Sequence, residues 1–293
     1  MTYTKKNSVM KILYPDWFRG FVASSPVGAA SLLLMLAILL IAILADVVSP
    51  FDPLQTDYKM LRHGPTLDHP MGQDFLGRDV LSRIIHGART TLFVAFASVF
   101  IGKLAGFSWG ISSAYFGGRF DLITQRFVEV LLAFPSIIFA LMLLVALGSG
   151  VITVILAISI GGMAGSTRVL RSAALTVKQN AYVEAARAMG ASELRIIVRH
   201  VAPQCFAPAM VVASVSLGGA IFAESALSYL GLGVPPPNPS LGNMLNEASV
   251  EFLNPLWWMV AFPGAVITLT ILLFNLLGDA LRDHLDPRLR GEL

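Results

Sequence analysis

Three ionisable residues lie inside strongly apolar stretches of the sequence: Lys103, Glu129 and Glu224. Because a charged side chain in hydrocarbon is costly, such residues usually face a water-filled cavity or one another. We therefore predict that Lys103 and Glu129 line a pore, with snorkelling or contact with a partner chain as the alternatives for Lys103. Glu224 stands near the end of its apolar stretch, where we expect it to hold an outer gate region together.

No residue pattern in the sequence indicates catalysis. The five histidines are scattered, and neither a serine nor the single cysteine, Cys205, accompanies a plausible base. The sequence also lacks the Gly-x-x-x-x-Gly-Lys-Ser/Thr loop that holds nucleotide phosphates. We expect no catalytic residue, no bound cofactor and no metal site in this chain, and one cysteine rules out an internal disulfide.

The most charged stretch, "YVEAARAMGASELRIIVRHVAP", runs from position 182 to 203 between two apolar segments. Good helix formers precede Gly190, which suits a helix end, and Ser192 can begin a second helix. The sequence predicts a helix-turn-helix elbow in which Glu184 and Arg187 can pair with another protein. The small residues that would let such a protein approach closely are Ala185, Ala186 and Ala188. The alternative is a loop whose charges serve only membrane topology.

Membrane-spanning helices must position the elbow and the ionisable residues. Hydrophobic residues make up 55% of the 293-residue chain and charged residues only 13%, against roughly 25% charged residues in soluble domains. A spanning helix needs about 20 mostly apolar residues. Six windows qualify: residues 27–48, 91–114, 127–147, 151–174, 206–228 and 256–278. Pro135 predicts a kink in the third of these helices.

Lysine and arginine concentrate in alternate connecting segments, which predicts that both chain termini are cytoplasmic. The expected organisation is a cytoplasmic tail (1–26), a first spanning helix (27–48), an external loop (49–90), a helical core (91–282) with a cytoplasmic loop at about 175–203, and a second cytoplasmic tail (283–293). We expect the external loop to contain an amphipathic helix that lies on the outer membrane surface. Its apolar face would consist of Val80, Leu81, Ile84 and Ile85.

The external loop also carries glycines and charged residues in close succession. Gly72, Gly77, Arg78, Asp79 and Arg83 fall within twelve positions. We expect these residues to cap or shape the outer mouth of the pore. The alternative is a purely structural role, in which the glycines make turns and the arginine and aspartate pair within the loop.

Four stretches together resemble a known family. The first is "EAARAMG" followed by "IIVRHVAP", which is similar to the EAA signature of bacterial ABC importers at Glu184, Ala185, Ala186, Gly190 and Pro203. The others are "HPMGQDFLGRDVLSRIIHGART", "FAESALSYLGLGVPPPNPSLGNML" and "PGAVITLTILLFNLLGDALRDHLDPRL". All four resemble the C-type permease subunit of the dipeptide, oligopeptide and nickel branch of that superfamily, from Pro26 to Leu289.

The resemblance implies an all-α membrane protein of the type I importer fold, with six transmembrane helices arranged as a five-helix core plus a peripheral first helix. It implies a pore subunit of the bacterial cytoplasmic (inner) membrane that works with a homologous second permease, two ATPase subunits and a periplasmic or lipid-anchored substrate-binding protein. ATP and Mg would be bound by the ATPase subunits, and no nucleic acid is expected as a partner. Tyr182 to Gly190 would be the coupling helix that docks on an ATPase, with Glu184 and Arg187 as polar contacts.

The resemblance leaves the solute open. A di- or oligopeptide is the first expectation, and the alternatives are nickel chelates, glutathione, opines or sugar derivatives. A more distant alternative is a proton-driven secondary transporter, which would also use buried carboxylates such as Glu129 and Glu224. Inverted halves or paired broken helices are typical of that class, and the hydropathy pattern indicates neither.

Overall fold

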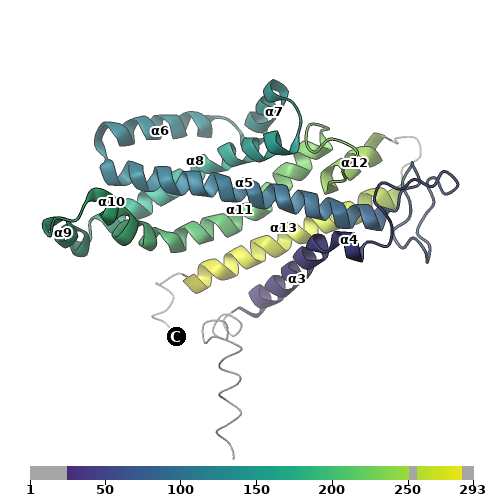
Figure 1. Ribbon diagram of the computed structural model, residues 1–293, viewed down its shortest axis with the longest axis horizontal. Coiled ribbons are helices and arrows are strands. Elements are labelled where there is room, and N and C mark those ends of the chain that lie inside the picture. Colours follow the sequence, from purple (N-terminus) through teal and green to yellow (C-terminus); the bar gives the residue numbers. More distant parts are fainter. Residues whose placement is uncertain (1–24, 251–255, 286–293) are drawn as a thin grey trace, which may run out of the picture.

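The computed structural model describes residues 25–250 and 256–285, and the described chain is almost entirely helical (Figure 1). The helices are α3 Pro26–Ile43, α4 Ala45–Val48, α5 Val80–Phe116, α6 Gly118–Ala133, α7 Ser136–Leu147, α8 Val151–Lys178, α9 Ala181–Ala188, α10 Glu193–Ile196, α11 Phe206–Tyr229, α12 Leu241–Val250 and α13 Trp257–Leu285. Within these ranges the only β pairing is an isolated bridge between Gln73 and Asp79. The tails 1–24 and 286–293 lie outside the described residues.

Five of the described helical segments are long and apolar enough to cross a membrane. They are Pro26–Ile43, Val80–Phe116, Val151–Lys178, Glu193–Tyr229 and Trp257–His284. The segment Glu193–Tyr229 contains a π turn at Ile197–Val201 and a 3₁₀ turn at Ala202–Cys205. These irregular turns adjoin Pro203, whose ring removes a backbone donor from the helix.

The third predicted span is not one kinked helix. The structure divides it into α6 and α7, whose axes differ by 90°. Phe134 precedes Pro135 and adopts an extended backbone, φ −96° and ψ 135°. A residue before proline avoids the helical region because the proline ring would clash with it. The proline therefore breaks the span, and a count of six requires that α6 and α7 together make one.

The external segment does not contain the separate surface helix that the sequence predicted. Val80 begins α5, which continues without interruption to Phe116. Val80, Ile84 and Ile85 are buried, and Val80 and Ile84 pack in one cluster with residues of α12 and α13. The predicted apolar face exists, but it packs against other helices of the chain instead of lying on the membrane surface. With a rise of about 1.5 Å per residue, α5 is about 55 Å long, well beyond a hydrocarbon core of about 30 Å.

Helix α5 packs closely along α8. The contact depends on glycines spaced four residues apart, because a Cβ atom added to Gly102 would lie 2.6 Å from the Ser159 carbonyl oxygen. At Gly106 it would lie 2.7 Å from the Ser166 Cβ atom. Small residues at such positions let two helix backbones approach closely in membranes.

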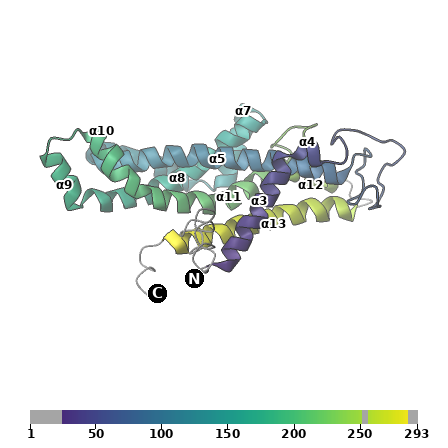
Figure 2. The ribbon, with the colours of Figure 1, turned by 60° about the horizontal axis from the view of Figure 1, so that its bottom comes forward.

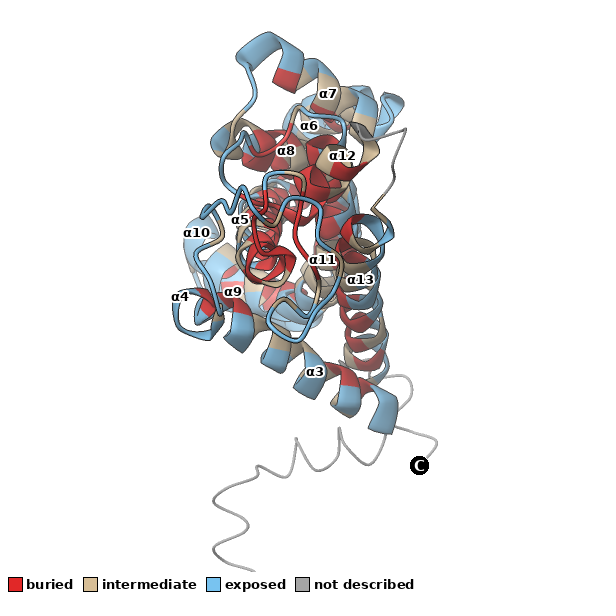
Figure 3. Ribbon diagram, turned by 90° about the vertical axis from the view of Figure 1, so that its right-hand side faces the viewer, coloured by how far each residue is buried: buried red, intermediate tan, exposed pale blue. Residues whose placement is uncertain are grey.

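The bundle is elongated, and its two ends differ. Helices α9 and α10 project at one end, whereas the loop before α5 and helix α12 lie at the other (Figures 1 and 2). Buried residues concentrate where α5, α8, α11 and α12 meet, while α3 lies at the periphery with most of its surface exposed (Figure 3). The exposed side chains of α3 are apolar, including Leu33 at 65% and Ile43 at 64% exposure. This is the surface that lipid would cover, as expected for a peripheral first helix.

Candidate functional site: a projecting elbow, a central cavity and an external ion cluster

Helix α9 forms the projecting part of the elbow at one end of the bundle (Figure 1). Its Val183 and Ala186 side chains are buried in a cluster with Ile111, Ala174 and Val201. The rest of the helix is exposed, namely Ala181, Tyr182, Glu184, Ala185, Arg187 and Ala188. The helix therefore holds to its own chain by one face and presents the other to solvent.

The elbow turns at the predicted glycine. Gly190 has a φ of +81°, a conformation that favours glycine. Its N–H donates to the Arg187 carbonyl at 3.0 Å, and Ser192 stands at the N-cap position of α10. The sequence thus located both the turn and the start of the second helix.

The C-terminal end of α5 anchors the elbow through Tyr115. This buried tyrosine donates a hydrogen bond from its hydroxyl to Glu193 and accepts one from Arg187 at 3.2 Å. Arg187 also lies 3.7 Å from the Glu193 carboxylate. The hydrogen bond to Tyr115, with the negative charge of Glu193, raises the pKa of Arg187. Lys178 donates to the Tyr115 carbonyl at 2.5 Å.

Two of the predicted contact residues have partners within the folded chain, although the Arg187 side chain is still 46% exposed. Ala186, expected at the contact surface, is 3% exposed and faces the interior. Arg187, expected to reach another protein, already bonds within the chain. Tyr115 and Glu193 were not identified from the sequence. The sequence held only a weak signal for them, namely that Arg187 has no obvious partner among its near neighbours other than Glu184.

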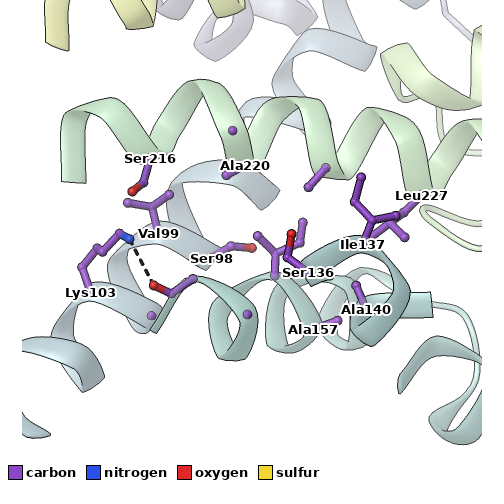
Figure 4. A pocket seen from close by; sticks show the side chains of 16 residues that line it. Ser98, Val99, Lys103, Ser136, Ile137, Ala140, Ala157, Ser216, Ala220 and Leu227 are labelled. Carbon is purple, nitrogen blue, oxygen red and sulfur yellow. Dashed lines mark hydrogen bonds between the residues drawn. The ribbon is translucent and has the colours of Figure 1, made fainter. Parts of the chain in front are cut away.

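A cavity of about 260 Å³ lies between α5, α7, α8 and α11. Its lining includes Ser98, Lys103, Ser136 and Ser216, with glycines and apolar side chains around them (Figure 4). Lys103 donates hydrogen bonds to the Ser166 hydroxyl at 2.7 Å and to the Gly162 carbonyl at 3.2 Å. The predicted pore residue Lys103 thus reaches a cavity through its ammonium group.

Glu129, the second pore candidate, does not line this cavity. It lies on an exposed face of α6 and pairs with Arg126 at 2.8 Å. The two side chains are 49% and 74% exposed. The break at Pro135 directs α6 away from α7. Glu129 can therefore lie at the surface of α6 and pair with Arg126, although the surrounding sequence is apolar.

The external loop is joined to α12 by a cluster of four charged residues. Arg78 pairs with Asp74 at 2.6 Å and with Glu247 at 3.0 Å. Arg83 pairs with the same Glu247 at 2.8 Å and lies 3.6 Å from Asp74. The Arg83 side chain is only 1% exposed. The sequence singled out both arginines, but it gave no indication of Glu247, which lies 164 residues beyond Arg83.

The remaining loop residues shape its backbone. Asp79 caps α5 by accepting from the Ser82 N–H at 2.7 Å, and its other oxygen lies 2.9 Å from His69 Nδ1. Gly77 has a φ of +74°, and a Cβ atom there would fall 2.1 Å from the Asp57 carbonyl oxygen. Gly72, with a φ of +77°, lies directly against Trp258. These contacts favour the structural alternative for the loop.

Glu224 is fully buried in α11, one turn before Ser228. The Ser228 hydroxyl donates to its carboxylate at 2.7 Å, and the Ser228 oxygen in turn accepts from the Val234 N–H at 3.2 Å. The carboxylate therefore fixes the turn that follows α11 rather than reaching the cavity.

Comparisons with known proteins point to one family. Residues 106–291 match a family described as binding-protein-dependent transport system inner membrane component. A Brucella suis protein named putative peptide transport system permease protein is 38% identical over 261 residues, 89% of this chain and 88% of the relative. An Escherichia coli protein named glutathione transport system permease protein is 38% identical over 278 residues, 94% of this chain and 91% of the relative.

A solved structure shares the fold at low sequence identity. It is titled as inward facing conformations of the MetNI methionine ABC transporter, and it is 18% identical to this chain. The match covers 70% of this chain and 96% of that chain with a TM-score of 0.57. The similarity is one of fold.

Proposed function

The chain belongs to the family of binding-protein-dependent transport system inner membrane components, and on that premise we propose that α9 is the helix by which a separate ATPase drives transport. The chain itself would bind neither ATP nor Mg, which would reside on two ATPase subunits. A homologous second permease would complete the pore. The substrate-binding protein would meet the end that carries the external loop.

The projecting elbow carries this proposal. Tyr182 is 43% exposed and Met189 is 82% exposed, although both are large apolar residues outside the membrane-spanning helices. Glu184 lies on the same exposed face. An apolar surface with a charge at its side is typical of a protein contact. Because Tyr115 and Glu193 hold the base of the elbow, a force on α9 would reach α5 directly.

The orientation follows from the same assignment. If the elbow meets an ATPase, its end of the bundle is cytoplasmic and the loop with Arg78 and Arg83 is external. The excess of lysine and arginine on the elbow side supports this orientation. Both termini would then be cytoplasmic.

We propose peptides as the solute, because a relative that is 38% identical over 89% of this chain is named as a peptide permease. A relative of equal identity is named as a glutathione permease. Glutathione is itself a small peptide, so it is the second candidate, and both carry carboxylate groups.

Cysteine crosslinking tests the coupling helix. Ala185→Cys places a thiol on the exposed face of α9, whereas Ala186→Cys places one on the buried face. The chain is purified with its co-expressed partners, and each variant is treated with a thiol crosslinker with and without ATP. We expect Ala185→Cys to crosslink to an ATPase in a nucleotide-dependent manner and Ala186→Cys to remain unreacted.

The native Cys205 is buried and serves as an internal background. Equal crosslinking at positions 185 and 186 would contradict the geometry of α9. No crosslink from Ala185→Cys in any nucleotide state, in a preparation that contains the ATPase, would contradict the proposed coupling.

A further inference from the structure

The cavity between α5, α7, α8 and α11 carries a single charge. Its sixteen described lining residues include Lys103 but no aspartate or glutamate. Three serine hydroxyls, from Ser98, Ser136 and Ser216, also line it. Lys103 and Ser216 lie together at one end, and Ala140 and Leu227 lie at the other (Figure 4). The space is thus apolar at one end and cationic at the other.

The Lys103 ammonium group has capacity to bind a further acceptor. It donates hydrogen bonds to the Ser166 hydroxyl and the Gly162 carbonyl, both of which are neutral. An ammonium group has three N–H donors. In the part of the chain that the structure describes, no carboxylate lies within ion-pair distance of Lys103. Its positive charge is therefore uncompensated.

Lys103 is half-buried. Desolvation of a charge without a counter-ion is costly, and an anion that enters the cavity would reduce that cost. The cavity has room for such a group, because its volume of about 260 Å³ far exceeds the roughly 10–15 Å³ that a single water molecule needs.

We propose that this cavity receives the C-terminal carboxylate of the transported peptide, with Lys103 as its ion-pair partner. The inference rests on the proposed function for the identity of the solute. The preference for an anion rests only on the charge of the cavity. Lys103 would then determine specificity for solutes with a free carboxylate.

The competing role for Lys103 is a clamp between α5 and α8, through its bonds to Gly162 and Ser166. Ser166→Ala separates the two roles, because it removes one of these bonds and leaves the charge in place. Lys103→Gln removes the charge, and Lys103→Arg retains it. These three variants form a matched set.

The first experiment measures anion preference without any solute. Ser216→Cys is introduced into the transporter purified with its partners, and its reaction rates are measured with an anionic sulfonate and a cationic trimethylammonium methanethiosulfonate reagent. We expect the ratio of anionic to cationic rates to fall about tenfold in Lys103→Gln. The ratio should be retained in Lys103→Arg and Ser166→Ala. An unchanged ratio in Lys103→Gln would overturn the inference.

The second experiment measures ATP-driven uptake of trialanine into proteoliposomes. We expect Lys103→Gln to lower uptake about tenfold and Lys103→Arg to restore most of it. Melting temperatures of the same preparations would identify any folding defect. Equal loss in Ser166→Ala would indicate a clamp and overturn the inference. Absence of trialanine uptake by the unmodified transporter would count against the proposed function, while the reagent ratio would still decide whether the cavity prefers anions.

Discussion

The ion cluster between the external loop and α12 allows a quantitative prediction. Glu247→Gln replaces the carboxylate that both Arg78 and Arg83 contact with a neutral amide of the same size. The Arg83 side chain, 1% exposed, would lose its closest counter-ion. We expect the external loop to separate from α12 more often, because the cluster is its charged link to that helix.

The free-energy cost of Glu247→Gln depends on how deeply the ion cluster is buried. Removing one partner of a buried ion pair costs about 3–5 kcal/mol. Glu247 is 19% exposed, and Asp74 remains 2.6 Å from Arg78, so the expected cost is lower, about 2–3 kcal/mol. This cost corresponds to an increase of about 30- to 140-fold in the opening equilibrium of the loop.

Amide hydrogen exchange measures that equilibrium. The Gln73 N–H donates to the His63 carbonyl at 2.8 Å and the Val80 N–H to the Gly72 carbonyl at 3.1 Å, and both amides report opening of the loop. The matched control is Glu129→Gln, the same chemical change in an exposed pair, for which about 0–1 kcal/mol is expected. If Glu247→Gln accelerates exchange of these amides by less than about fivefold, or no more than the control does, the cluster does not hold the loop.

Two further predictions concern helix packing and the elbow. Gly102→Ala would place a Cβ atom 2.6 Å from the Ser159 carbonyl oxygen and should destabilise the protein by about 1–3 kcal/mol. Gly165→Ala in α8 meets nothing within 4 Å and should be neutral or stabilising by up to about 1 kcal/mol; equal melting temperatures for the two variants would contradict the close packing of α5 on α8. Tyr115→Phe removes the hydroxyl that contacts Arg187 and should weaken the anchoring of α9 by about 1–2 kcal/mol. Exchange of the α9 amides should then accelerate about 5- to 30-fold, and unchanged exchange would show that Tyr115 does not anchor the elbow.

The positions of most helices could be predicted from the sequence, because hydropathy is a local property that a window of residues carries by itself. The first span, the fourth and the sixth appear as α3, α8 and α13, and the elbow turns at Gly190. The four motifs identified the permease family, and the family match and the shared fold confirm that identification.

The consequences of proline and the pairing of charges were harder to predict. Pro135 marked a kink in sequence, but the 90° angle between α6 and α7 is set by what each helix packs against. In the sequence, Glu129 and Glu224 could not be distinguished, because each is a glutamate within an apolar stretch. Tertiary structure placed Glu129 on the surface beside Arg126 and buried Glu224 completely.

Which face of a helix is buried was also decided only in the folded chain. Ala185 and Ala186 are chemically equivalent neighbours in the sequence, yet one is exposed and the other is 3% exposed against α5 and α8. Arg83 and Glu247 meet across 164 residues. The sequence by itself determined where the chain is apolar, helical or able to turn, because these are properties of short stretches. Only the tertiary structure decided which charges meet and which surfaces remain for partners, because those depend on contacts between segments that are distant in the chain.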